Sequence, residues 1–191
     1  EAIARFEAFI KKYPRDRKRT PDAMYRLGDL YYEKSEDDYA RAETKKDKLD
    51  SLYERGKLAE KPKEPAKNYN NSLRIWRKLI AQFGKKHRFA APVYYLIGYV
   101  LSEQGRSDEA ITAWTTLLDE YPKSEWTPEV ILRVGEIHFD DGEFEKAGAV
   151  YRRALNHKGH KYYGLAIYKL AWTYMQQDQY DPAIKTFLKL I

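Results

Sequence analysis

The chain has 191 residues, of which 43% are hydrophobic and 34% charged, and its net charge is +6. This composition is typical of a globular protein with one sizeable core or a run of small stacked units. The chain has no cysteine, which excludes disulfides, thiolate metal sites and cysteine nucleophiles. Its longest uncharged run, residues 89–102, is too short for a membrane-spanning helix, which needs about 20 residues. Because residue 1 is Glu rather than Met, we expect a fragment of a longer protein.

Residues 1–20 are the first predicted element, and they contain a single helix. Ala2, Phe6 and Phe9 recur at helical spacing, and Pro14 closes the helix. These residues are therefore expected to form the second helix of a helix pair.

Residues 21–90 are predicted to form a longer helix pair. Thr20 before Pro21 has the pattern of an N-cap followed by proline at the first helical position. The first helix should run from Pro21 to about Glu60, where "KPKEP" breaks it, and the second from about Ala66 to Phe83. At about 1.5 Å per residue, the first helix would be roughly 60 Å long and would project beyond its neighbours.

The insertion at about residues 36–67 lengthens this first helix, and its role is open. It holds nine basic and nine acidic residues, and its apolar residues form only a thin series at helical spacing. One interpretation is a solvated excursion with no role. The other is an arm that binds a partner or another copy of the chain.

Three further pairs are predicted over residues 91–127, 128–163 and 164–191, the last one truncated. Gly98 recurs 37 residues later as Gly135 and after another 36 as Ala171, and Gly28 precedes them. Each small residue should lie where the first helix presses against the second, so that a side chain there would hold the helices apart. Like Thr20, the threonine of "EWTPEV" is predicted to be an N-cap. Gly105 and Gly142 should end the first helices.

The repeated residues resemble the tetratricopeptide repeat, with a large residue, Leu-Gly, Tyr, and later Ala four residues before an aromatic residue. The match lies at Met24, Leu27, Gly28 and Tyr31, and at Ala110, Trp114 and Pro122. The resemblance implies an all-α fold: an α-solenoid of stacked antiparallel helix pairs of about 12 to 15 residues per helix, wound into a right-handed superhelix, with one elongated pair.

In this family the first helix of each pair lines the concave surface, and we call its lining residues the A-helix face. Tyrosine and tryptophan recur at binding hot spots, so this face is predicted to bind a peptide or protein, with Asp29 and Glu136 orienting a basic or amide group. The alternative is that some rings pack under residues that the chain lacks. The predicted binding residues are Tyr25, Asp29, Tyr32, Tyr95, Tyr99, Arg133, Glu136, Phe139, Tyr168 and Trp172.

Positive charge is concentrated in the first half of the chain, since residues 1–90 carry a net +9 and residues 91–191 a net −3. Two connections between helix pairs hold much of it and should form one basic rim: Arg15, Arg17, Lys18, Arg19, Lys85, Lys86 and Arg88. The rim is either a solvated edge or a contact for an acidic protein, lipid headgroups or nucleic acid. Nucleic acid is disfavoured, because the A-helix face itself is not basic.

No pattern of catalytic residues is present. His157 and His160 lie three apart without a further ligand nearby, and "DDGEFE" lacks the alternating spacing of a calcium loop. We therefore expect a non-catalytic scaffold with no metal, no cofactor and no membrane span, which binds a protein or peptide and could also self-associate through its ends or its arm.

Among tetratricopeptide repeat proteins, "YPKSEWTPEVILRVGEIHF" resembles bacterial cell-envelope proteins: outer-membrane assembly lipoproteins, periplasmic division coordinators and gliding-motility repeat proteins. The insertion followed by "YNNSLRIWRKLIAQF" resembles the last group most. This implies a location in the periplasm or at the outer membrane. A cytoplasmic adaptor and a nucleic-acid-binding superhelix are the alternatives.

Overall fold

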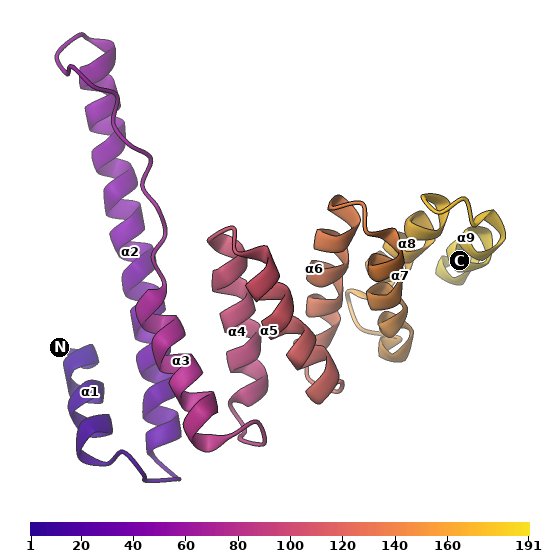
Figure 1. Cartoon of the computed structure of the whole chain (residues 1–191), viewed down its shortest axis with the longest axis horizontal. Coiled ribbons are helices and arrows are strands. Elements are labelled where there is room, and N and C mark those ends of the chain that lie inside the picture. Colours follow the sequence, from indigo (N-terminus) through magenta and orange to yellow (C-terminus); the bar gives the residue numbers. More distant parts are fainter. The chain divides into compact units, whose positions relative to one another are not determined.

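The structure is a computed structural model that describes residues 1–191, and all its regular elements are helices. The α-helices are α1 (Ala2–Lys12), α2 (Thr20–Glu54), α3 (Asn70–Phe83), α4 (Ala90–Glu103), α5 (Ser107–Glu120), α6 (Thr127–Asp140), α7 (Phe144–Arg152), α8 (Tyr163–Met175) and α9 (Tyr180–Phe187) (Figure 1). Two short 3₁₀ helices are η1 (Arg153–His157) and η2 (Leu188–Leu190). No helix meets both the length and the hydropathy that a membrane span requires.

The chain divides into two compact units, which we describe separately. Unit 1 consists of residues 1–93 and 99–106, so it holds α1, α2, α3 and the two ends of α4. Unit 2 consists of residues 94–98 and 107–191, so it holds the middle of α4 and all later helices.

Helices pair closely because a glycine of the first helix faces a ring of the second. The three pairs are Gly28 with Trp76, Gly98 with Trp114, and Gly135 with Tyr151. A Cβ added at any of these glycines would lie only 2.0 to 2.3 Å from the nearest ring atom. All three rings are fully buried, Trp76 in unit 1 and Trp114 and Tyr151 in unit 2. The predicted reason for the recurring small residues is thereby confirmed at these three positions.

Positive φ angles end the first helices, as predicted. Gly105 and Gly142 have φ of 70° and 74°. After α4, the N–H of Gly105 donates to the carbonyl of Ser102 and the N–H of Arg106 to that of Leu101, which is a Schellman motif. Asp178 takes the same position after α8 with φ of 55°.

The long helix α2 ends at Glu54, six residues before the predicted end. Gly56 has φ of 68°, and its N–H donates to the carbonyl of Tyr53 while the N–H of Lys57 donates to that of Leu52. The prediction was wrong because it assigned the end to "KPKEP" and overlooked this glycine, which closes a Schellman motif. The helix has 35 residues and is therefore about 53 Å long.

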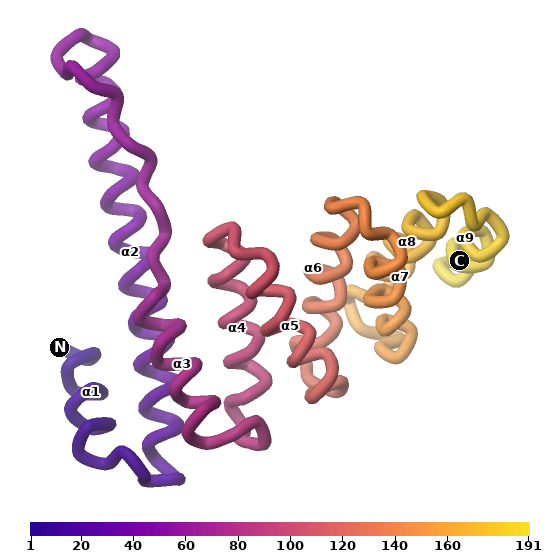
Figure 2. The backbone as a smooth tube through the Cα atoms, viewed as in Figure 1, coloured from indigo at the N-terminus to yellow at the C-terminus, as the bar shows by residue number.

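The chain then returns alongside α2 without regular structure (Figure 2). The second helix, α3, starts at Asn70 rather than at about Ala66. Lys46 of α2 forms ion pairs with Asp50 of the same helix at 2.6 Å and with Glu64 of the returning segment at 3.0 Å. The far half of α2 and this segment together form the arm. Leu52 and Tyr53 near its tip stay 38% and 40% exposed.

The predicted threonine N-caps are wrong. Thr20 and Thr127 are the first residues of α2 and α6, and no side chain caps either helix. Their hydroxyls instead donate to the carbonyls that follow the preceding helices, of Tyr13 and, at 2.8 Å, of Tyr121. Both threonines are fully buried, so each one ties the start of a helix pair to the end of the helix before it.

Two second helices are shorter than the predicted 12 to 15 residues. Helix α7 has 9 residues and α9 has 8, and each continues as a 3₁₀ turn. Arg153, the first residue of η1, forms an ion pair with Asp119 at 2.7 Å and donates to the carbonyl of Leu118. Tightening into 3₁₀ geometry is common in the last turn of a helix.

Candidate functional site

In unit 1, aromatic rings line the A-helix face of α2. Tyr25, Asp29 and Tyr32 are spaced by four and three residues, which places them on one side of the helix. Tyr25 stacks on Phe89 with ring centroids 4.6 Å apart. Tyr32 meets the edge of Tyr99 at 6.4 Å. The structure therefore brings together four of the predicted binding residues.

Asp29 lies between these rings and has no partner. It is partly buried and makes no hydrogen bond or ion pair. Burial raises the pKa of Asp29 to about 6, because it disfavours the charged carboxylate. Arg26 lowers this pKa and Glu33 raises it further. The site thus holds a carboxylate whose charge nothing in the chain compensates directly.

We expect Asp29→Asn to stabilise the protein at about pH 7 but not at about pH 4. Since the pKa of Asp29 is higher in the folded state, its stabilisation is complete below its ordinary value and is lost as the pH rises through about 6. At about pH 7 the variant should be more stable by about 1 kcal/mol, less than the full pKa shift implies, because the carboxylate is only half-buried. Urea unfolding at both pH values measures this, and an equal difference at the two would contradict it.

In unit 2, two of the predicted binding residues, Tyr95 and Arg133, already contact other side chains of the same unit. Tyr95 stacks on Trp126 with ring centroids 4.4 Å apart, and its hydroxyl donates to Glu129 at 2.8 Å. Nε and Nη2 of Arg133 donate to the same carboxylate at 2.9 and 2.7 Å. Burial and Glu129 raise the pKa of Tyr95 to about 12. Trp126 and Glu129 were not among the predicted binding residues, although Glu129 lies one turn before Arg133 on α6.

Glu136 and Phe139 also have internal partners. Glu136 of α6 forms an ion pair with Lys169 of α8 at 3.2 Å. Phe139 meets the edge of Phe144 with centroids 5.3 Å apart. Of the two carboxylates expected to orient a partner, only Asp29 is therefore unpaired.

Tyr168 and Trp172 remain on the surface of α8, where they are 43% and 41% exposed. Phe187 of α9 meets the edges of both rings, with centroids 5.9 and 6.4 Å away. Exposed apolar side chains continue along α8, α9 and the start of η2: Leu165, Tyr180, Ile184 and Leu188. Unit 2 thus presents a cluster of three rings, Tyr168, Trp172 and Phe187, and further exposed apolar side chains on the same helices.

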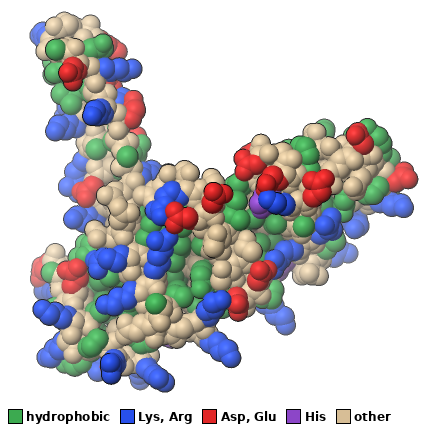
Figure 3. Space-filling model, in the orientation of Figure 1, with side chains coloured by type: hydrophobic (Ala, Val, Ile, Leu, Met, Phe, Trp, Pro, Cys, Tyr) green, Lys and Arg blue, Asp and Glu red, His purple; other side chains and the backbone are tan.

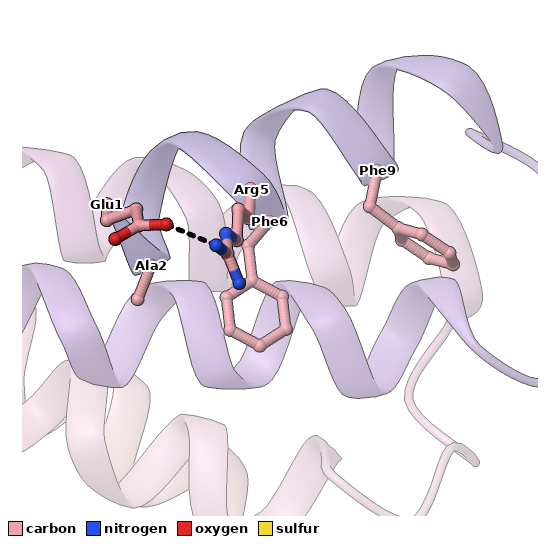
Figure 4. A pocket seen from close by; sticks show the side chains of 5 residues that line it. All are labelled: Glu1, Ala2, Arg5, Phe6 and Phe9. Carbon is pink, nitrogen blue, oxygen red and sulfur yellow. Dashed lines mark hydrogen bonds and ion pairs between the residues drawn. The ribbon is translucent and has the colours of Figure 1, made fainter.

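A hollow of about 560 Å³ lies on α1, outside the predicted binding residues. It is lined by Glu1, Ala2, Arg5, Phe6 and Phe9 (Figure 4). In the repeat pattern, Ala2 and Phe6 correspond to Ala110 and Trp114, which are both fully buried in unit 2. The hollow therefore lies on the side of α1 that a first helix covers in a complete pair.

The two basic connections of unit 1 lie side by side. The side chain of Gln82 donates to the carbonyl of Pro14, which links the end of α3 to the connection after α1. Arg19 pairs with Asp16 at 2.8 Å and Arg88 pairs with Asp22, so two of the predicted basic residues are neutralised. Figure 3 shows Lys and Arg side chains gathered at this end of unit 1. Four of the predicted residues are exposed and form no ion pair: Arg15, Arg17, Lys18 and Lys86.

Lys67 holds the base of the arm, although no sequence pattern singles this residue out. Its amine pairs with Glu103 at 2.7 Å and lies 3.9 Å from Glu36. The side chain of Gln104 donates to the carbonyl of Lys67 at 3.1 Å. The carboxylate of Glu103 raises the pKa of Lys67. These contacts hold the returning segment between α2 and the end of α4.

No group of three or more histidine, aspartate or glutamate side chains is close enough to hold a metal ion. His157 and His160 lie near one another, and the pKa of His157 is lowered, mainly by burial and also by His160.

The helix pairs define the class of this protein as an α-solenoid. Two Tetratricopeptide repeat models match the sequence, one over residues 1–46 and 95–161 and the other over residues 165–191. The chain therefore belongs to the tetratricopeptide repeat family. Proteins of this family generally mediate protein–protein interactions and are generally non-catalytic scaffolds.

A solved structure supports the same fold. The chain is similar to the C-terminal part of a TPR repeat-containing protein from Cytophaga hutchinsonii, with a TM-score of 0.51 and 16% sequence identity. The match covers 87% of this chain and 63% of that one. No curated protein matches. The predicted all-α class of helix pairs is confirmed, whereas the cell-envelope subtype stays a prediction.

Proposed function

We propose that this chain is a scaffold that binds an extended or helical segment of a partner protein through its A-helix faces. The main support is the half-exposed pair Tyr168 and Trp172 on α8. Rings of this kind supply large contact area at low entropic cost and keep a polar tip for hydrogen bonding. In unit 1 the corresponding contact groups are Tyr25, Tyr32 and Tyr99.

The other predicted residues have a supporting role in this proposal. Tyr95 and Arg133 share the carboxylate of Glu129, and Glu136 is paired with Lys169. These bonds hold the first helices of unit 2 in position, so less side-chain entropy is lost when a partner binds. We therefore assign direct contact to the exposed rings of α8 and the partly buried rings of unit 1, and positioning to Tyr95, Arg133 and Glu136.

The proposal is tested with a library of short random peptides displayed on phage. Peptides selected on the wild-type protein should lose at least roughly tenfold in affinity with Tyr168→Ala and with Trp172→Ala, because hot-spot rings each contribute about 2 kcal/mol or more. Circular dichroism should show unchanged helicity. The matched control is Tyr53→Ala, since Tyr53 is 40% exposed but lies on the arm.

Two outcomes would contradict this assignment. If both A-helix variants bind the selected peptides like the wild type, the exposed rings are not the contact. If Tyr53→Ala alone abolishes binding, the arm is the contact, which is the other interpretation of the insertion.

We also propose that the partner belongs to a complex of the bacterial cell envelope, in the periplasm or at the outer membrane, with a gliding-motility complex as one candidate. The support is the sequence resemblance of residues 121–139 and 69–83 to such proteins. A lipoprotein or secretion signal in the full-length sequence, together with recovery of the protein in the envelope fraction, tests it. Recovery in the cytoplasm would favour an adaptor there.

Nucleic acid is the weaker candidate partner. Two arginines of the basic rim are already paired with carboxylates, and the A-helix faces carry few basic residues. Salt-dependent binding of random RNA or DNA would favour nucleic acid over a protein as the partner.

A further inference from the structure

The unpaired carboxylate of Asp29 indicates what kind of side chain a partner brings to unit 1. We propose that the bound segment places a lysine or arginine side chain against Asp29, between the rings of Tyr25 and Tyr32. This inference rests on the proposed function, because it requires that a partner binds to the A-helix face. It adds the chemistry of the contact, which is a single basic side chain.

The repeat itself provides the comparison. Asp29 follows Gly28 as Glu136 follows Gly135, so the two carboxylates occupy the same position of their helix pairs. Glu136 pairs with Lys169 at 3.2 Å, and Lys169 lies two residues before Ala171 on the next first helix. Two residues before Gly98, the corresponding residue is Leu96. In the sequence, this position therefore holds a lysine in the pair that follows Glu136 and a leucine in the pair that follows Asp29.

Two basic residues of unit 1, Arg26 and Arg88, do not replace that cation. Arg26 precedes Asp29 by three residues on α2, but it is exposed and forms no ion pair with it. Arg88 is paired with Asp22. The half-buried carboxylate of Asp29 therefore has no ion-pair partner. Its pKa is raised because burial disfavours the charged form.

The surrounding rings suit a cation better than a neutral group. Tyr25 and Tyr32 flank Asp29 on the same side of α2, and an ammonium or guanidinium group over a tyrosine ring is attracted by the ring quadrupole. Cations already lie over rings elsewhere in the chain, as Arg88 does over Phe89 at 4.7 Å. Each ring stacks one face on another ring, Tyr25 on Phe89 and Tyr32 on Tyr69 at 5.4 Å, which leaves the second face for a lysine or arginine that pairs with Asp29.

The basic rim does not oppose this contact strongly. Asp22, which pairs with Arg88 at the rim, precedes Asp29 by seven residues, a rise of about 10 Å along α2. This separation is close to the Debye length of about 8 Å at physiological ionic strength. Attraction to Asp29 is therefore local, and the rim weakens it little.

The test uses the same phage-displayed peptide library, now read for sequence. Selection on the wild-type protein should enrich peptides with lysine or arginine at one constant position. Replacing that residue by norleucine, which keeps an unbranched aliphatic side chain but removes the charge, should weaken binding roughly tenfold. Asp29→Asn should weaken binding of the original peptide by a similar factor. Asp37→Asn, the same change at an exposed position farther along α2, should not.

A second readout separates a direct contact from a structural effect. NMR titration of the Asp29 carboxyl should show a pKa near 6 in the free protein, and this pKa should fall when the basic peptide binds, because a nearby cation favours the charged form. The norleucine peptide should not lower it.

The outcomes distinguish the two proposals. If the selected peptides need Tyr168 or Trp172 but show no preference for a basic residue, the basic contact is overturned and the proposed function stands. If the preference persists in Asp29→Asn, the basic side chain binds elsewhere and the inference is equally overturned. If no peptide depends on any A-helix residue, the proposed function itself fails.

Discussion

Gly98→Ala is expected to destabilise unit 2 by about 2 to 3 kcal/mol, although alanine is favoured over glycine in a helix by about 1 kcal/mol. The added Cβ would lie 2.3 Å from Nε1 of Trp114. This ring is fully buried, so the clash requires the two helices to move apart. Urea unfolding followed by circular dichroism measures the loss.

Two further variants make this result specific. Gly164→Ala, where an added Cβ meets nothing within 4 Å, should stabilise the protein by about 0.5 to 1 kcal/mol. Trp114→Phe should restore part of the stability of Gly98→Ala, because the same positions of the last pair hold Ala171 and Phe187. A stability of Gly98→Ala equal to that of the wild type would contradict the requirement for a glycine at this helix contact.

Trp114→Ala should cost about 3 to 5 kcal/mol, the range for truncating a large buried ring. Besides its burial, the Trp114 N–H donates to the carbonyl of Tyr95 at 3.1 Å, and Arg133 lies over the ring at 5.9 Å. Hydrogen exchange should show the largest loss of protection in the amides of α4, α5 and α6.

Trp76 is the matched control in unit 1, since it is equally buried but its Nε1 has no hydrogen-bond partner. Trp76→Ala should cost less than Trp114→Ala by about 1 kcal/mol, because both remove a buried ring but only the second also loses a hydrogen bond. Trp76→Phe should cost less than Trp114→Phe by about 1 kcal/mol, because only the second loses a hydrogen bond. Equal costs for the two phenylalanine variants would contradict this assignment.

The repeat and its helix pairs could be predicted from the sequence because the small residues and the rings recur at a fixed interval. Gly28, Gly98 and Gly135 report a local requirement, which is the space between two adjacent helices. The end of α2 was also encoded locally, at Gly56. The prediction instead relied on the two prolines of "KPKEP", because proline is a strong helix breaker. The path of residues 55–69 could not be predicted, because the segment has no periodicity and is held by side chains distant in the sequence.

The candidate site was predictable only in part. Helical periodicity places Tyr25, Asp29 and Tyr32 on one face whatever surrounds them. Whether such residues are available depends on partners from other helices, such as Lys169 for Glu136 and Phe89 for Tyr25. The partners in each pair are more than 30 residues apart in the sequence, so no local pattern predicts them. Thr20 and Thr127 show the same limit, since the carbonyls that they bind lie across a connection.

These two threonines have a consequence for how such a chain grows. Each threonine hydroxyl donates to the carbonyl of the residue that follows the preceding helix. The donor and the acceptor of this hydrogen bond therefore both lie at the ends of the short segment that connects two helix pairs. A gene duplication that copies a helix pair together with the connection before it would also copy this hydrogen bond. New copies could then be added without any matching change in the older ones.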